Sequence, residues 1–593
     1  MTGRATRLNS ILTAGLLTLA LAGCASTEVA EAPPAAPPPA PAPPPPVLAA
    51  EPSAEIGDVV VTARRREESV QSVPSAITVL SSEQLTRGPA AKGGVARSAV
   101  QGMIAPRPYP RPMPMPAPEQ RERYDGKEVA SIMSVADAPV STFSVDVDTG
   151  AYSNARRFLN AGQLPPADAV RTEEMINYFR YDYAKPADRD TPFTVTTDLA
   201  TTPWNPNSRL LRIGIRGYDL PRAERPAANL VFLVDVSGSM NSPDKLPLVQ
   251  AALSMVADKV TARDRVSIVV YAGAAGVVLE PTSDPAKIRA ALSQLQAGGS
   301  TAGGAGIQLA YATARAHRIA GGINRVILAT DGDFNVGVSS TKELEELVKR
   351  QRDDGITLTT LGFGEGNYNE SAMERIADVG NGNYAYIDSA TEAQKVLDDE
   401  LASTLFTIAK DVKIQVEFNP AQVSEYRLIG YENRALAEED FDNDKVDAGD
   451  IGAGHQVTAI YEIVPRGAKG WLPDRRYEGN RPAAEAGVAK GGELAFVKLR
   501  YKAPTGDVSK LIERPVPASL IASARPPSGD MAFAVAVAAF GQRLRGDKYL
   551  GNYGFADIRA LAGSQTNFWR QEFIRLTSLA EARSGGGSPA AGR

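Results

Sequence analysis

Short apolar runs alternate with amphipathic helical patterns through the centre of the chain. The run Asn-Leu-Val-Phe-Leu-Val at 229–234 is followed at once by a polar loop and then by a predicted helix over 244–260. Continuous apolar strands that alternate with helices are typical of a doubly wound parallel sheet, whose ligands bind at the carboxyl ends of the strands. Further strands are predicted at 265–271, 325–330, 357–363 and 384–387, and further helices at 285–295, 304–318, 341–352, 371–379 and 391–405.

The pattern differs on both sides of this centre. A strand with apolar Phe143, Val145 and Val147 on one face is predicted at 141–149, followed by helices near 152–161 and 171–179. After residue 405 a period of two predicts antiparallel strands, and the chain closes with two helices, of which the first is too short in its apolar part to span a membrane. These strands lie at 412–418, 426–431, 457–464 and 494–501, and these helices at 531–544 and 567–582.

Composition narrows the chemistry. Of the 43 prolines, ten lie in 33–46 and seven in 105–118, and such segments cannot form a core. The net charge of −5 gives no reason to expect a nucleic-acid partner. One cysteine and two histidines exclude an intramolecular disulfide, a cysteine zinc cage and a histidine-rich metal site. A resident metal is therefore expected to be a hard ion held by oxygen.

The single cysteine lies at the end of a secretory signal. Arg4 and Arg7 precede an apolar run over 11–22, and the sequence Leu-Ala-Gly-Cys that ends at Cys24 resembles a bacterial lipobox. The resemblance implies a signal peptide over 1–23, lipidation of Cys24 and a location in the envelope of a Gram-negative bacterium. The same resemblance favours the outer membrane, because Ala25 stands where an Asp would resemble the signal that retains lipoproteins in the inner membrane. The alternative is an ordinary secretory signal with an incidental cysteine.

Residues 24–118 are predicted to be a proline-rich linker with one unusual insertion. Residues 56–85 resemble the start of the plug of TonB-dependent outer-membrane receptors, with a stretch similar to a TonB box. A β-branched run in flexible chain can add to the edge of a partner's sheet. The alternatives are a remnant without function and a short strand docked on its own protein. The stretch consists of Asp58, Val59, Val60, Val61, Thr62 and Ala63.

Polar residues follow three of the predicted central elements in the order of a known pattern. Asp235, Ser237 and Ser239 follow the first strand, Thr301 lies in a glycine-rich loop, and Asp331 follows a later strand. These residues resemble the metal-ion-dependent adhesion site of the von Willebrand factor type A (VWA) family. Ser300 is an alternative to Thr301 in the second loop.

The resemblance extends over residues 124–582, because both flanks are similar to those of bacterial VWA proteins. It implies an α/β fold in which a central Rossmann-like VWA domain is flanked by an amino-terminal α+β domain and a β-rich carboxyl-terminal domain ending in helices. The expected organisation is a flanking domain at 119–220, the VWA domain at 226–408, a second flanking domain at 411–582 and a tail at 583–593.

The resemblance also implies what the site does. All five side chains offer oxygen, which suits Mg²⁺, with Mn²⁺ or Ca²⁺ as alternatives. The serines and Thr301 would contact the metal, and Asp235 and Asp331 would act mainly through waters. An open metal position would accept an Asp or Glu from a partner protein of unknown identity. We therefore expect a membrane-anchored binding module, not an enzyme. The alternatives are a structural or assembly lipoprotein without metal-dependent binding, and a metal-dependent hydrolase.

Two further acidic groups are expected to be solvated. Asp146 and Asp148 share one face of the strand at 141–149, without a loop of additional ligands. Seven acidic residues lie within 438–450, where Lys445 and Val446 interrupt the spacing that a calcium loop needs.

Overall fold

The computed structural model describes residues 122–585 apart from 146, 302, 333–340, 367, 400–402, 404 and 474–491, together with the strand pair 60–61 and 68–69. Cys24 and the proline-rich segments lie outside the described residues. Residues 1–73 and 74–593 form two units. In the first unit, β1 (Val60–Val61) pairs antiparallel with β2 (Glu68–Ser69), so this part of the TonB-box-like stretch pairs with its own chain.

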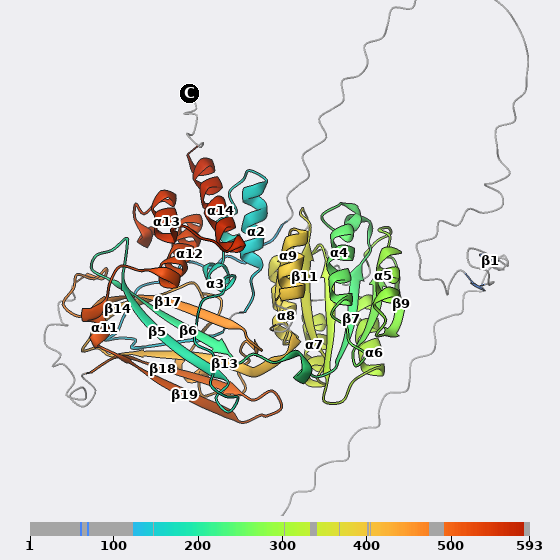
Figure 1. Cartoon of the computed structure of the whole chain (residues 1–593), viewed down its shortest axis with the longest axis horizontal. Coiled ribbons are helices and arrows are strands. Elements are labelled where there is room, and N and C mark those ends of the chain that lie inside the picture. Colours follow the sequence, from blue (N-terminus) through green and yellow to red (C-terminus); the bar gives the residue numbers. More distant parts are fainter. Residues whose placement is uncertain are drawn as a thin grey trace, which may run out of the picture. The chain divides into compact units, whose positions relative to one another are not determined.

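The central sheet of the second unit has the predicted doubly wound arrangement, with strand order β12-β11-β10-β7-β8-β9 (Figure 1). Every neighbouring pair is parallel except β8 and β9. The strands are β7 (Ala228–Asp235), β8 (Arg265–Tyr271), β9 (Ala275–Thr282), β10 (Ile323–Thr330), β11 (Thr357–Phe363) and β12 (Tyr384–Ile387).

Helices cover both faces of this sheet, because each buried strand has apolar side chains on both sides. Val231 and Leu233 of β7 pack in a cluster with α6, α7 and α8, whereas Phe232 and Val234 pack with α4, α5 and α9. The helices are α4 (Leu246–Ala257), α5 (Pro285–Ser293), α6 (Gly303–Ala316), α7 (Thr341–Asp353), α8 (Glu370–Val379) and α9 (Ala390–Gln394).

The edge strand β9 was not predicted. Val277, Val278 and Leu279 are only half-buried there, and their pattern does not alternate.

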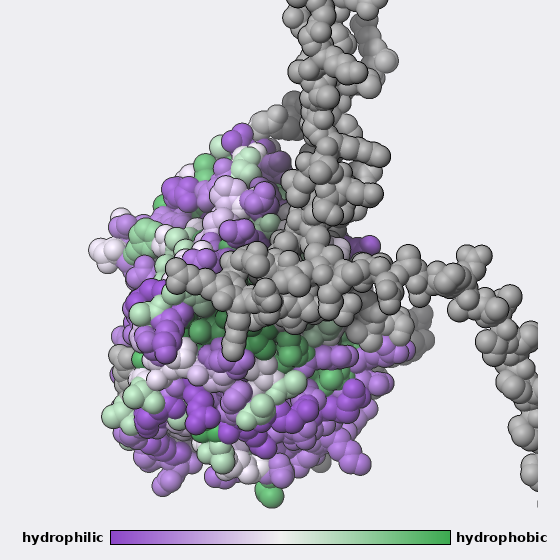
Figure 2. Space-filling view, turned by 90° about the vertical axis from the view of Figure 1, so that its right-hand side faces the viewer, coloured by the Kyte–Doolittle hydropathy of each residue, from purple (hydrophilic) through white to green (hydrophobic). Residues whose placement is uncertain are grey.

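The side of the molecule on which Figure 1 places β9 faces the viewer in Figure 2. Most residues on this side are hydrophilic, and apolar residues gather near its middle.

The two flanking segments contribute strands to the same two sheets, although they were expected as separate domains. One sheet has the order β15-β4-β13-β18-β19, with β16 also paired to β13, and the other has the order β3-β14-β17-β6-β5. Phe143 of β4 contacts Tyr461 of β17, so residues from both segments meet in the core between the sheets. The strands are β3 (Met133–Ser134), β4 (Val140–Ser144), β5 (Phe193–Thr201), β6 (Arg209–Gly217), β13 (Thr407–Phe418), β14 (Val423–Ile429), β15 (Ala435–Leu436), β16 (Ile451–Gly452), β17 (Gln456–Pro465), β18 (Glu493–Lys502) and β19 (Ser509–Pro517).

A helical layer covers the second of these sheets. Leu210 of β6 and Ile460 of β17 belong to one cluster with residues of α2, α3, α12, α13 and α14. The apolar run of α12 is fully buried in this cluster, as predicted for a core helix. Across the described part of the chain, none of the helices is long and apolar enough to cross a membrane. The helices are α2 (Gly150–Asn160), α3 (Thr172–Asn177), α11 (Ser519–Ser523), α12 (Gly529–Arg545), α13 (Phe555–Ala562) and α14 (Phe568–Ser584).

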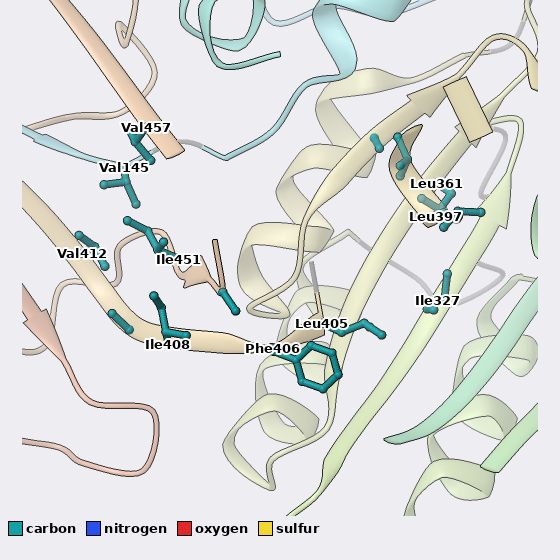
Figure 3. Close-up of a cluster of buried hydrophobic side chains, with 14 of the residues drawn as sticks. Val145, Ile327, Leu361, Leu397, Leu405, Phe406, Ile408, Val412, Ile451 and Val457 are labelled. Atoms are coloured by element: carbon teal, nitrogen blue, oxygen red, sulfur yellow. The ribbon is translucent and has the colours of Figure 1, made fainter. Parts of the chain in front are cut away.

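A continuous apolar cluster joins the central sheet to the flanking sheets. Ile327 of β10 and Leu361 of β11 belong to the same cluster as Ile408 and Val412 of β13 (Figure 3). Leu405 lies between these two groups in the chain and in the figure. The VWA domain therefore shares its core with the flanking domain.

Of the two expectations about acidic residues, one was wrong and the other is largely confirmed. Asp148 is buried rather than solvated, because it accepts a hydrogen bond from the Tyr384 backbone nitrogen and pairs with Arg434; Asp146 lies outside the described residues. In the acidic loop at 438–450 most of the seven acidic residues are exposed, as expected, and the exposed Asp442 and Asp444 pair with Arg500 of β18.

Candidate metal site at the carboxyl edge of the central sheet

Asp235 is the last residue of β7 and is fully buried. Its Oδ1 accepts a hydrogen bond from the Ser237 backbone nitrogen at 2.8 Å. Its Oδ2 accepts hydrogen bonds from the Tyr271 hydroxyl and the Thr330 hydroxyl, each at 3.1 Å. Tyr271 and Thr330 are the last residues of β8 and β10, so three adjacent strand ends fix this carboxylate.

The two serines lie side by side. The Oγ atoms of Ser237 and Ser239 are 3.0 Å apart, with Ser237 buried and Ser239 half-buried. An octahedral Mg²⁺ with Mg–O distances of about 2.1 Å separates adjacent ligand oxygens by about 3.0 Å. The spacing of the two hydroxyls therefore suits adjacent positions on such an ion.

The glycine-rich loop is attached to the first loop through the backbone. The Gly238 nitrogen donates to the Gly299 oxygen at 3.0 Å, and the Gly298 nitrogen donates to the Val236 oxygen at 2.8 Å. This attachment brings Thr301, which is half-buried two residues before α6, to the same edge of the sheet, whereas Ser300 is exposed. The assignment of Thr301 as the ligand stays a prediction.

Asp331 follows β10 and is buried next to Asp235. The register places Ala329 opposite Val234, so both carboxylates lie just beyond paired positions of two parallel strands. Burial raises the pKa of Asp235 to about 6, and the negative charge of Asp331 contributes to this rise, while hydrogen bonds from Ser237 oppose it. A bound cation would relieve both effects.

The donor set is suited to a hard divalent ion. In the described ranges, no three His, Cys, Asp or Glu side chains are grouped so that they could hold a metal. The predicted site instead combines two carboxylates with three hydroxyls. All five are oxygen donors, the kind that Mg²⁺ and Ca²⁺ prefer.

The sequence did not reveal three residues that contact the two carboxylates. Tyr271 and Thr330 were placed correctly at strand ends, but nothing in their order along the chain shows that both donate to Asp235. Gly306 of α6 leaves room for Tyr271, because a Cβ atom at this position would lie 2.7 Å from Tyr271 Cβ. The sequence did not show this role either. The third is Lys245, whose Nζ donates to Asp331 Oδ2 at 2.9 Å; it directly precedes α4, inside the region predicted as helix.

The comparisons with known proteins agree with this fold. Family models match residues 118–212 ("von Willebrand factor"), 229–399 ("von Willebrand factor type A domain") and 403–582 ("Uncharacterized protein YfbK, C-terminal"). Over 471 residues the chain is 49% identical to the Escherichia coli K12 protein named "Uncharacterized protein YfbK". The matched region covers 77% of this chain and 81% of that protein. The chain belongs to the YfbK family. The prediction of a VWA domain with the flanks of this family is confirmed.

Weaker similarities cover smaller parts of the chain. A "UPF0353 protein" of Mycolicibacterium vanbaalenii is 30% identical over 155 residues, or 24% of this chain and 46% of that protein. The solved structure titled "von Willebrand factor type A from Catenulispora acidiphila" is 16% identical and covers 67% of this chain and 91% of its own, with a TM-score of 0.37.

Proposed function

We propose that this chain is a lipid-anchored envelope protein that docks a partner protein through a divalent cation. The cation would be held by Asp235, Ser237, Ser239, Thr301 and Asp331. The observation that carries the proposal is the arrangement of the first three residues, in which a fully buried carboxylate is fixed by three hydrogen bonds beside two hydroxyls at the spacing of octahedral ligands.

The number of oxygen ligands at this site leaves room for a partner oxygen on the ion. The hydroxyls and the two carboxylates leave Mg²⁺ fewer protein ligands than the six it takes, so waters or a partner oxygen must supply the rest. An Asp or Glu from a partner is the strongest of the available ligands. VWA domains as a class support a role in interaction rather than in catalysis.

A capture experiment tests metal-dependent docking. The mature protein is used to capture proteins from an envelope extract in Mg²⁺ and in EDTA, and wild type is compared with Asp235→Asn. Asn is preferred to Ala, because Ala would leave the buried donors of Ser237, Tyr271 and Thr330 without their acceptor. Loss of a close charge contact costs about 2 to 5 kcal/mol, which corresponds to a fall in affinity of about 30-fold to several thousand-fold.

A matched control keeps the result specific. Asp442→Asn removes a carboxylate whose side chain is 83% exposed and which pairs with Arg500, far along the chain from the site. A partner of the proposed kind is lost in EDTA and with Asp235→Asn, and is retained with Asp442→Asn. A partner that binds equally in EDTA and to Asp235→Asn contradicts metal-dependent docking.

The anchor is tested separately. Cys24→Ser removes the thiol that would be lipidated, and with it the acyl chains that would hold the protein on the membrane. We expect the variant to appear in the soluble fraction or to remain unprocessed, without incorporation of labelled palmitate. Equal membrane association and equal labelling would contradict the anchor. Contact of Asp58–Ala63 with TonB stays a prediction.

A further inference from the structure

Lys245 places a buried positive charge inside the candidate metal site. Its Nζ is 2.9 Å from Asp331 Oδ2, and the two side chains are 9% and 0% exposed. Ion pairs of this kind are screened far less than pairs at the surface. A bound divalent cation would therefore share Asp331 with the ammonium group of Lys245.

The backbone provides room for this lysine. Gly364, which follows β11, has a φ of +69°, and a Cβ atom there would lie 2.3 Å from Cγ and 2.4 Å from Cε of Lys245. Only a residue without a side chain leaves this path open. The aliphatic stem of Lys245 is thus held in one course that ends at Asp331.

The charges of the site add up differently with and without Lys245. Asp235 and Asp331 contribute two negative charges and the three hydroxyls none, so a divalent cation alone would be neutralised by the protein. With Lys245 the loaded site retains one positive charge. In a buried site the charge of Lys245 has two effects. It repels the metal, and it attracts an anionic group of the partner.

We propose that Lys245 is a positioning residue that weakens the hold of the site on its divalent cation and strengthens the attraction of the loaded site for a partner carboxylate. This inference rests on the proposed function. Cation affinity and carboxylate affinity should therefore change in opposite directions when the ammonium is removed, whereas a purely structural ion pair would lower both or neither.

The test uses the purified mature protein with two variants. Lys245→Met keeps most of the stem without the charge, and Lys245→Arg keeps the charge. Calorimetric titration with MgCl₂ should show binding on the order of tenfold tighter for Lys245→Met and little changed for Lys245→Arg. With Mn²⁺ loaded, acetate should displace bound water from Lys245→Met several-fold less readily than from wild type, as measured by water proton relaxation.

The outcomes separate this inference from the proposed function. Mg²⁺ binding to wild type with unchanged or weaker binding to Lys245→Met overturns the role of Lys245 alone. Binding by Lys245→Met that wild type lacks supports the role of Lys245 and contradicts metal loading of the native site. Absence of binding by both variants and wild type overturns both. Melting temperatures measured in EDTA and in Mg²⁺ show whether Lys245→Met is folded. The rise in melting temperature on adding Mg²⁺ should be larger for Lys245→Met than for wild type.

Discussion

Two buried charged regions of the second unit are built on opposite plans. At the candidate metal site, two buried carboxylates are accompanied by one ammonium group and by hydroxyls. At the contact between α2 and the VWA domain, the Arg156 guanidinium binds three carboxylates. It lies 2.5 Å from Asp388, 2.7 Å from Glu392 and 2.9 Å from Glu572, and its own side chain is 3% exposed.

The difference indicates which region is structural and which is available to a ligand. The Arg156 cluster matches its three carboxylates with three cations, because Lys395 attracts Glu392 electrostatically and Arg575 lies 3.9 Å from Glu572. Its carboxylates therefore meet cations of the same chain. At the metal site the negative charge exceeds what Lys245 supplies, and the remaining demand is suited to an added ion.

The largest effect is expected from breaking the Arg156 cluster. Arg156→Leu leaves Asp388 and Glu392 buried without their main counter-charge, which typically costs about 3 to 5 kcal/mol. Urea denaturation should show this loss in the free energy of unfolding. Lys185→Met is the control, because the Lys185–Asp219 pair is 67% and 49% exposed and such pairs contribute about 0 to 1 kcal/mol. Equal losses would mean that the Arg156 cluster does not stabilise the contact.

An intermediate effect is expected at Glu370, where α8 meets the flanking segment. Burial raises the pKa of Glu370 to about 8, with Arg171 opposing the rise. Tyr384 donates to its Oε1 at 3.5 Å, and its Oε2 has no hydrogen-bond partner among the described residues. An ionised Glu370 would therefore lack full compensation, as the carboxylates of the metal site do, but it is enclosed by protein.

The sign of the pH dependence follows from this raised pKa. Between pH values of about 4.5 and 8 the folded state binds a proton at Glu370 that the unfolded state has lost, so stability falls as pH rises through this window. Glu370→Gln should remove that slope and be more stable than wild type at pH 7 by about 3 kcal/mol, with little difference at pH 4.5. Parallel stability curves for both proteins would contradict a neutral Glu370.

The smallest effect is expected from the metal itself. A ligand that binds only the folded state at ten times its Kd stabilises it by about 1.4 kcal/mol. Thermal unfolding of wild type should shift upward in Mg²⁺ and return in EDTA, whereas Asp235→Asn should not respond. Arg156→Leu should be less stable but should keep the full Mg²⁺ shift, because its cluster is separate from the site. Loss of the shift in Arg156→Leu would show that the two regions are coupled.

The same contrast explains what could be predicted from the sequence. Asp235, Ser237 and Ser239 lie within five residues, and parallel strands bring Asp331 to the same edge, so pattern alone locates these positions. The partners of Arg156 are 232, 236 and 416 residues away. A cluster assembled across such separations leaves no local signal in the sequence.

The shared sheets were hidden for a similar reason. β4 of the amino-terminal segment pairs with β13 of the carboxyl-terminal segment, Phe143 lying opposite Ile414. Each segment shows its own period of two, which predicts a strand but does not indicate the strand with which it pairs. β5 was missed altogether, because most of its residues are half-buried and its threonines blur the alternation.

The central claim is that Asp235 and Asp331 take part in holding one divalent cation. Calorimetric titration of the mature protein with MgCl₂, beside the double variant Asp235→Asn, Asp331→Asn, tests it most directly. Circular dichroism confirms beforehand that both proteins are folded. We predict one Mg²⁺ per chain for wild type and no measurable binding for the double variant. Equal Mg²⁺ binding by the two proteins would contradict the site.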